Sequence, residues 1–255
     1  MSEAIRLLAA RVTAVTGADR HFGNALAQGL ADAGSALVLA GQDDQRALNA
    51  NAEALRDNGA AVAVAPLAAS DRATLRGSIE AASRELGGLD ALVHARVPVE
   101  ALAPHPITTL DDAGWDARCE GVFVEALAAA QVGFDLLKQR GGAIVFVAAT
   151  HSLAGAAEFC PYAAATEAIR AMARSGAKQW GQHGIRLNCI APSLDMLLEE
   201  GAAGTGRLSL GDAPLPLTGD PRYDVAPTVA LLASEASANL TGASLRADGG
   251  VWMAG

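Results

Sequence analysis

The chain lacks an excess of positive charge, and it lacks a long apolar run free of charge. Its 255 residues include 19 Lys and Arg against 28 Asp and Glu, a net charge of −9. This balance argues against nucleic acid and against anionic membrane surfaces as partners. No apolar stretch is long enough to span a bilayer, and Glu3 and Arg6 argue against a signal peptide. We therefore expect neither a membrane nor a nucleic-acid partner.

Cysteine and metal-ligand patterns are sparse as well. Cys119, Cys160 and Cys189 form no C-x-x-C pair, which predicts reduced core thiols in a cytoplasmic chain. His94 and His151 end adjacent predicted strands, but no ligand spacing supports a metal site. We expect no metal.

Apolar residues are abundant, at 51% against 18% charged, which is enough for a large core. The mean hydropathy of +0.23 is high for a soluble monomer. Hydrophobic interfaces between subunits would account for it.

Short β-rich runs alternate with longer helical patterns along the chain. This alternation predicts one α/β domain over residues 1–255, a Rossmann-like doubly wound parallel sheet of about seven strands with helices on both faces. The expected strands are 11–15, 36–40, 61–65, 91–94, 143–147, 185–190 and 244–247. The expected helices are 22–33, 43–57, 71–85, 112–139, 161–181 and 224–234. Glycines at 34, 59, 88 and 184 stand where helix C-caps are expected.

The stretch 201–221 is rich in Gly and Pro, so it continues neither a helix nor a central strand. It follows the sixth predicted strand, at the carboxyl edge of the sheet, where ligands bind in open α/β folds. Two interpretations stay open, a substrate lid and a mobile surface loop.

Several segments along the chain have a recognisable pattern. They are 12–17 (VTAVTG), 86–93 (LGGLDALV), 141–145 (GGAIV), 184–192 (GIRLNCIAP) and 240–250 (LTGASLRADGG), with Trp115-Asp116 and Tyr162 between them. Together they resemble the short-chain dehydrogenase/reductase family, and they cover nearly the whole chain in the family's order. The resemblance implies a Rossmann-like fold, but fold does not carry function, so each site position needs its own comparison.

The dinucleotide loop departs from the family pattern T-G-x-x-x-G-x-G. Gly17 and Gly23 are present, but His21 replaces the middle glycine. A side chain there would crowd a pyrophosphate, and a residue needing positive φ would be strained. The loop is then a turn with a helix-packing glycine; the alternative is that His21 holds a different anion.

The other positions that hold the cofactor in the family have also changed. Gln42 stands where an acid or a base would contact the ribose, and the two residues after it are interpreted as an N-cap and a first-turn acid. The adenine-binding Asp corresponds to Ala68, and the N-N-A-G turn is replaced by His94-Ala95-Arg96-Val97. The P-G turn beside the nicotinamide is Pro192-Ser193, and Leu197 replaces a Thr. We expect this chain to bind no cofactor.

Of the catalytic tetrad that the resemblance implies, only Tyr162 remains. The Lys position holds Thr166, the Ser position Ala149 and the Asn position Val122. A phenol of pKa near 10 is a poor base at neutral pH without an adjacent cation. Tyr162 is therefore interpreted as a packed aromatic.

Unorthodox chemistry is the alternative. His151 and Ser152 lie just beyond Ala149 and form an acid/base or nucleophile pair in principle, although consecutive side chains usually diverge. Halohydrin dehalogenases also carry an aromatic in the glycine loop, as Phe22 does here, but this chain lacks the Ser and Arg of their triad.

The segments that build the family's fold are present, whereas its cofactor and catalytic positions have changed. This combination predicts a protein that acts by binding another protein rather than by catalysis. The resemblance extends to the non-catalytic subunits of heteromeric acyl-CoA-type dehydrogenases, as in anaerobic toluene and benzylsuccinate breakdown. We expect a pseudoenzyme with no activity alone. Its partner would be an active paralogue, an alcohol or 3-hydroxyacyl-CoA dehydrogenase holding NAD, in a heterotetramer. The alternatives are an active enzyme using Tyr162 and a sensor of a small ligand.

Overall fold

A parallel β-sheet forms the centre of the molecule. The computed structural model describes residues 6–67, 71–198 and 210–253. Its strands are β1 (Val12–Thr16), β2 (Ala36–Gly41), β3 (Val62–Pro66), β4 (Ala91–His94), β5 (Gly142–Val147), β6 (Ile185–Pro192) and β7 (Ser244–Ala247). They form one seven-stranded sheet in the order β3-β2-β1-β4-β5-β6-β7, and every neighbouring pair is parallel. This confirms the predicted fold class.

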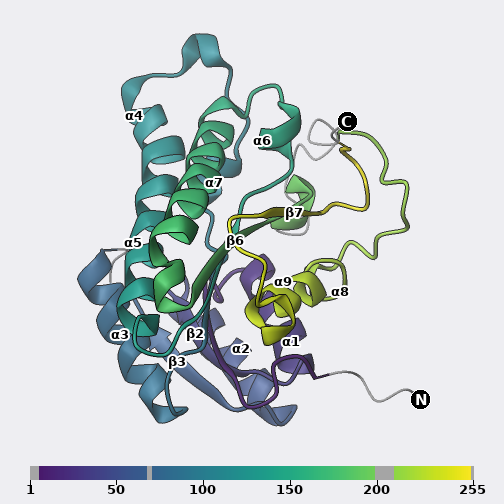
Figure 1. The fold of residues 1–255 in the computed structure, drawn as a ribbon. Helices are drawn as coiled ribbons and strands as arrows, with labels where there is room; N and C mark the ends of the chain where they lie inside the picture. Colours follow the sequence, from purple (N-terminus) through teal and green to yellow (C-terminus); the bar gives the residue numbers. More distant parts are fainter. Residues whose placement is uncertain (1–5, 68–70, 199–209, 254–255) are drawn as a thin grey trace.

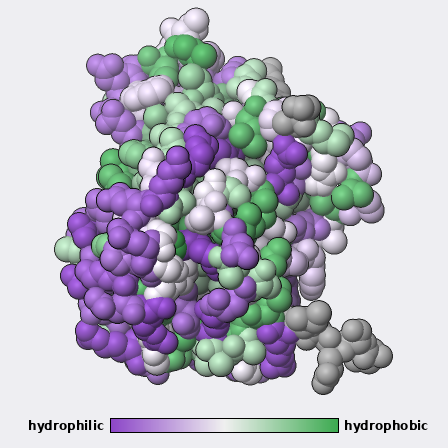
Figure 2. Space-filling model, in the orientation of Figure 1, coloured by the Kyte–Doolittle hydropathy of each residue, from purple (hydrophilic) through white to green (hydrophobic). Residues whose placement is uncertain are grey.

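Helices cover both faces of the sheet (Figure 1). One layer contains α1 (His21–Asp32), α2 (Gln45–Asp57), the short α8 (Pro221–Asp224) and α9 (Ala226–Ala233). The other contains α3 (Arg72–Glu85), α5 (Gly121–Leu137) and α7 (Cys160–Trp180). Because both faces are covered, all five residues of β1 are buried. Hydrophilic side chains gather on the outer surface over α3 (Figure 2).

Helix ends follow the expected chemistry, with one correction. The side chain of Asp71 caps α3 by accepting from the backbone N–H groups of Ala73 and Thr74. At α2 the cap is Asp44, which accepts from the N–H of Ala47 at 2.9 Å. The predicted N-cap at Asp43 and first-turn acid at Asp44 are therefore each one residue early: the backbone of Asp44 is still extended (φ −139°, ψ 93°), and the helix begins at Gln45.

The helix predicted over 112–139 is not continuous. It consists of α4 (Asp112–Trp115), a π-helical turn at Asp116–Glu120, and α5. The turn closes on Gly121, where a Cβ would come within 3.3 Å of the Asp116 carbonyl oxygen. A π turn contains one residue more than an α-helical turn, and hydrophobic periodicity does not reveal a single inserted residue. Turns of this type are frequent at functional sites.

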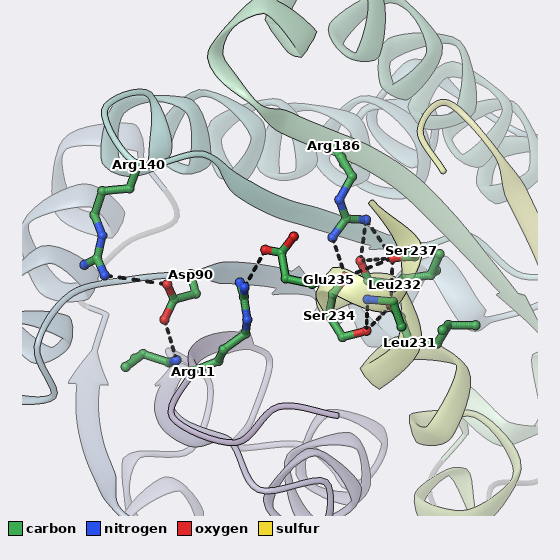
Figure 3. Close-up of polar contacts among 11 residues, drawn as sticks. Arg11, Asp90, Arg140, Arg186, Leu231, Leu232, Ser234, Glu235 and Ser237 are labelled. Carbon is green, nitrogen blue, oxygen red and sulfur yellow. Dashed lines mark hydrogen bonds and ion pairs between the residues drawn. The ribbon is translucent and has the colours of Figure 1, made fainter. Parts of the chain in front are cut away.

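Polar contacts tie the amino ends of the strands together (Figure 3). Asp90, just before β4, accepts from the Val12 N–H and pairs with Arg140. Arg186, on β6, donates to the Leu232 and Ser234 carbonyls and to the Ser237 hydroxyl. These contacts are structural, whereas ligands of open parallel sheets bind outside the carboxyl ends of the strands.

The carboxyl ends of β6 and β7 adjoin the Gly/Pro-rich stretch. Residues 201–209 lie outside the described part of the chain. In the remainder, the Leu215 N–H bonds the Gly249 carbonyl, and Thr218 and Gly219 donate to the Asp224 carboxylate. These contacts dock the described part on the C-terminal turn, and its role as a lid stays a prediction. No helix among the described residues has the length and apolarity that a membrane crossing requires.

Candidate functional site

The strand order reverses direction between β1 and β4, and an open parallel sheet leaves a crevice at such a point, outside the carboxyl ends of the strands. The turn after β1 and the residues after β2 and β4 meet there. Tyr162 lies farther along the same edge, at the start of α7.

The two retained glycines have packing reasons of their own. Gly17 has φ +73°, and a Cβ on it would lie 2.8 Å from Arg96 Cα. A Cβ on Gly23 would lie 2.1 Å from the Gly17 carbonyl oxygen. Both positions therefore require glycine for the turn and for close approach of α1, with no ligand involved.

His21 is the exposed first residue of α1, with a helical backbone. The only non-glycine residues with positive φ in the described ranges are Ala10 and Glu158. The strain considered for His21 is therefore absent, because in this structure the position is helical.

Arg96 crosses the crevice. Its guanidinium pairs with Asp43, beyond β2, at 3.0 Å and with Glu125 on α5. Burial disfavours the charge of Arg96, but these two carboxylates outweigh burial and raise its pKa. The pKa of Asp43 is lowered: burial works against this, but hydrogen bonds and charge interactions with Arg96 and Arg20 prevail. The cavity left beneath, between residues such as Thr16, His94 and Glu125, measures about 20 Å³.

The glycine loop also carries an acid. Asp19 is buried, and one carboxylate oxygen accepts from the Asp43 N–H at 2.7 Å and the Asp44 N–H at 3.0 Å. A hollow of about 290 Å³ lies at the start of α1, lined by Asp19 and Asp44 as well as Arg20 and His21. Its carboxylates would repel a pyrophosphate that approached the N–H groups of the helix.

Tyr162 is buried, with 1% of its surface exposed. Its hydroxyl makes no hydrogen bond of ordinary geometry within the described residues. Burial raises the pKa of the phenol well above 10, although the Ala149 backbone and the Arg170 charge act in the opposite direction. The prediction of a packed aromatic fits this environment.

The positions of the lost tetrad carry no replacement groups. The Thr166 hydroxyl donates to the carbonyls of Tyr162 and Ala163 at 3.0 Å each, so it bonds its own helix. Ala149 and Val122 are buried apolar side chains. None of the three supplies the charge, hydroxyl or amide that the family pattern calls for.

Arg170 is a buried cation that the sequence reasoning missed. It donates to the Ala148 and Ala149 carbonyls and to the Ser152 hydroxyl, and it pairs with Glu167 at 2.7 Å. Tyr162, Thr166 and Arg170 are spaced four residues apart, so they share one helix face. An arginine on the buried face of α7 was the available signal.

The candidate helpers are placed differently from one another. His151 is buried. The Ser152 hydroxyl is only partly buried; it donates to the Ala149 carbonyl at 3.0 Å and accepts a hydrogen bond from Arg170. His94 is buried against the Thr16 hydroxyl, 2.9 Å from its Nδ1, and burial with the nearby Arg96 charge lowers its pKa to about 3. No cluster of three or more metal-ligating side chains occurs in the described ranges. The cysteines at 119, 160 and 189 are free thiols.

Comparisons with known proteins agree with this architecture. A family model described as enoyl-(acyl carrier protein) reductase matches residues 17–252. Cis-4-hydroxycyclohexanecarboxylate dehydrogenase of Sinomonas cyclohexanicum is 32% identical, over 95% of this chain and 96% of its own length. The chain belongs to the short-chain dehydrogenase/reductase family.

Further relatives span the same length. The 3-oxoacyl-[acyl-carrier-protein] reductase of Vibrio cholerae is 29% identical over 96% of this chain and 99% of its own. A Sinorhizobium meliloti protein assigned to the short-chain alcohol dehydrogenases superposes with a TM-score of 0.84 at 28% identity, covering 97% of this chain and 98% of that one. These similarities support an oxidoreductase family. The finer resemblance to a degenerate subunit of a heteromeric dehydrogenase gains no support from them.

The residues of this short-chain dehydrogenase/reductase do not fit a dinucleotide as they stand. Small-molecule sites typically measure about 300–1,000 Å³. The cavity beneath Arg96 measures about 20 Å³, and the hollow at the start of α1, which Asp19 and Asp44 line, measures about 290 Å³. Arg96 and Asp19 occupy the approaches, and Leu197 is a buried apolar side chain in a short 3-10 helix. Ala68 lies outside the described residues.

Proposed function

We propose that this protein is a non-catalytic member of the short-chain dehydrogenase/reductase family that assembles with, and supports, an active NAD-dependent relative. The observation that carries the proposal is the Arg96 side chain, which spans the crevice between Asp43 and Glu125. With that crevice filled, a dinucleotide has no room for the end that would lie at the strand reversal.

The surroundings of Tyr162 support the same proposal. General acid/base catalysis works best when the pKa lies near the working pH. Here burial raises the phenol pKa, and neutral Thr166 stands one turn along the helix. Proton exchange with a substrate oxygen at neutral pH would be slow.

Surfaces for assembly are available. Symmetric contacts between subunits of this family type require matching elements on each partner. Alanine-rich α5 and α7 are intact, and Val124 on α5 is 58% exposed. Asn188 ties β6 to the segment before β7 through the Leu240 carbonyl and the Ala243 N–H. We infer an alcohol or 3-hydroxyacyl-CoA dehydrogenase paralogue as partner, in a heterotetramer.

The proposal is tested by calorimetric titration and by co-expression. NADH and NADPH should show no micromolar binding to the purified chain, because the crevice is filled. Co-expression with an intact relative should give a stable complex with dehydrogenase activity, while this chain alone gives none. Micromolar cofactor binding by this chain, or a relative that is fully active and never co-purifies with it, contradicts the proposal.

A second candidate is an active oxidoreductase that uses Tyr162. The comparisons favour it, since the relatives named above are dehydrogenases and reductases of nearly equal length. The buried charge of Arg170 acts on Tyr162 in the direction that an activating cation would. A purified homo-oligomer should then turn over some carbonyl, alcohol or halohydrin, and Tyr162→Phe should abolish that activity. Turnover unaffected by this substitution rejects Tyr162 as the acid or base.

A further inference from the structure

The crevice at the strand reversal is filled by the chain itself. The Arg96 backbone packs against Gly17, and its side chain reaches Asp43 in one direction and Glu125 in the other. These elements are otherwise separate: Asp43 follows β2, Arg96 follows β4, and Glu125 lies on α5. One side chain therefore joins three walls of the crevice.

The fit is tight. Only 11% of the Arg96 side chain and 15% of the Glu125 side chain are exposed. A water molecule needs about 10–15 Å³ of such volume, so the remaining cavity of about 20 Å³ has room for one. An adenine ring has no room while Arg96 holds this position.

The contacts are matched in charge. Breaking a buried ion pair by removing one partner leaves an uncompensated charge, which is costly. Arg96 is balanced by Glu125 and Asp43, and Asp43 is also paired with Arg20 at 3.3 Å. The two arginines and two carboxylates of this cluster therefore balance in charge without a ligand.

We propose that Arg96, with Glu125 and Asp43, is an internal latch that closes a latent adenosine site, and that removing the latch opens the site. This inference rests on the proposed absence of nucleotide binding. It adds a cause for the adenosine end: the closure there resides in one removable side chain and its partner. The strands beneath would remain in place, and Asp19 and Asp44 would still repel a phosphate at the start of α1.

The test compares a double variant with a matched single variant. Arg96→Ala with Glu125→Ala removes the latch together with the carboxylate that it contacts on α5, whereas Glu125→Ala alone leaves Arg96 in place on Asp43. Adenosine is the probe, because it has no phosphate for the Asp19 and Asp44 carboxylates to repel. Calorimetry should show adenosine binding at least about tenfold tighter in the double variant than in the wild type or the single variant.

The outcomes separate the latch from the proposed function. A folded double variant that binds adenosine no better than the wild type overturns the latch and leaves the proposed function standing. A wild type that binds adenosine as tightly as the double variant overturns the latch and argues against the proposed function as well. If the double alanine variant does not fold, Arg96→Ala with Glu125→Gln takes its place, because it keeps a neutral polar group beside α5.

Discussion

Single side chains decide the chemistry at the carboxyl edge of this protein. Tyr162 lies in family register, yet its hydroxyl is buried without a cation on the next helical turn, where Thr166 bonds its own backbone. Arg170 carries a positive charge, but its guanidinium donates hydrogen bonds to the Ala148 and Ala149 carbonyls. A residue type therefore does not reveal its role until its partners are known.

His94 gives a pH dependence that belongs to one residue. Its pKa is about 3 in the folded state, against 6.5 for an ordinary histidine. As pH falls below 6.5, His94 binds a proton in the unfolded chain but stays neutral in the folded chain. The free energy of unfolding therefore decreases between about pH 6.5 and pH 3. At pH 5 the loss from this residue is about 2 kcal/mol.

Chemical denaturation at pH 7 and pH 5 measures this effect. His94→Asn should reduce the difference in unfolding free energy between the two pH values. His21→Asn, on the exposed start of α1, is the matched control and should leave the difference unchanged. Equal differences in the wild type and in His94→Asn would show that His94 is not the titrating group.

Elements form where local chemistry and burial agree. Asp44 caps α2, Asp71 caps α3, and glycines with φ of +94°, +88° and +69° follow α1, α2 and the turn after α7. The π turn at Asp116–Glu120 is the exception, because it depends on how this segment packs against α7. Periodicity finds a helix there and misses its interruption.

The cap of α2 is open to a direct test. Asp44→Ala removes the acceptor for the Ala47 N–H, and the loss of an N-cap typically costs about 1 kcal/mol. For a protein of this size, that corresponds to a fall in Tm of about 2–4 °C. Asp44→Asn keeps an acceptor at the same position and should melt close to the wild type; an equal fall in both variants would contradict a capping role.

In the whole molecule, the two ends of the sheet strands have different roles. At the amino ends of the strands, the contacts of Asp90 and Arg186 join loops that are distant in sequence (Figure 3). At the carboxyl ends, Arg96 and its partners fill the crevice that the strand order creates. Sequence relatives share the scaffold across this division, which is why family membership is clear while the function of this member depends on a few side chains.

The sequence by itself determined the parallel sheet, its seven strands and the helices on both faces. Short β-rich runs such as 143–147 and 185–190 alternate with helical patterns that end in glycines, and this specifies the elements locally; the family segments specify their order. The family resemblance also aligns the tetrad positions with Val122, Ala149 and Thr166 through fixed spacings, and this assignment stays a prediction.

The tertiary structure alone decided which charges meet. Asp43, Arg96 and Glu125 are far apart in sequence and become partners only because β2, β4 and α5 converge at one edge. The burial of Arg170 against the end of β5 has the same origin. Ion pairs of this kind depend on long-range geometry, to which neither periodicity nor local spacing is sensitive.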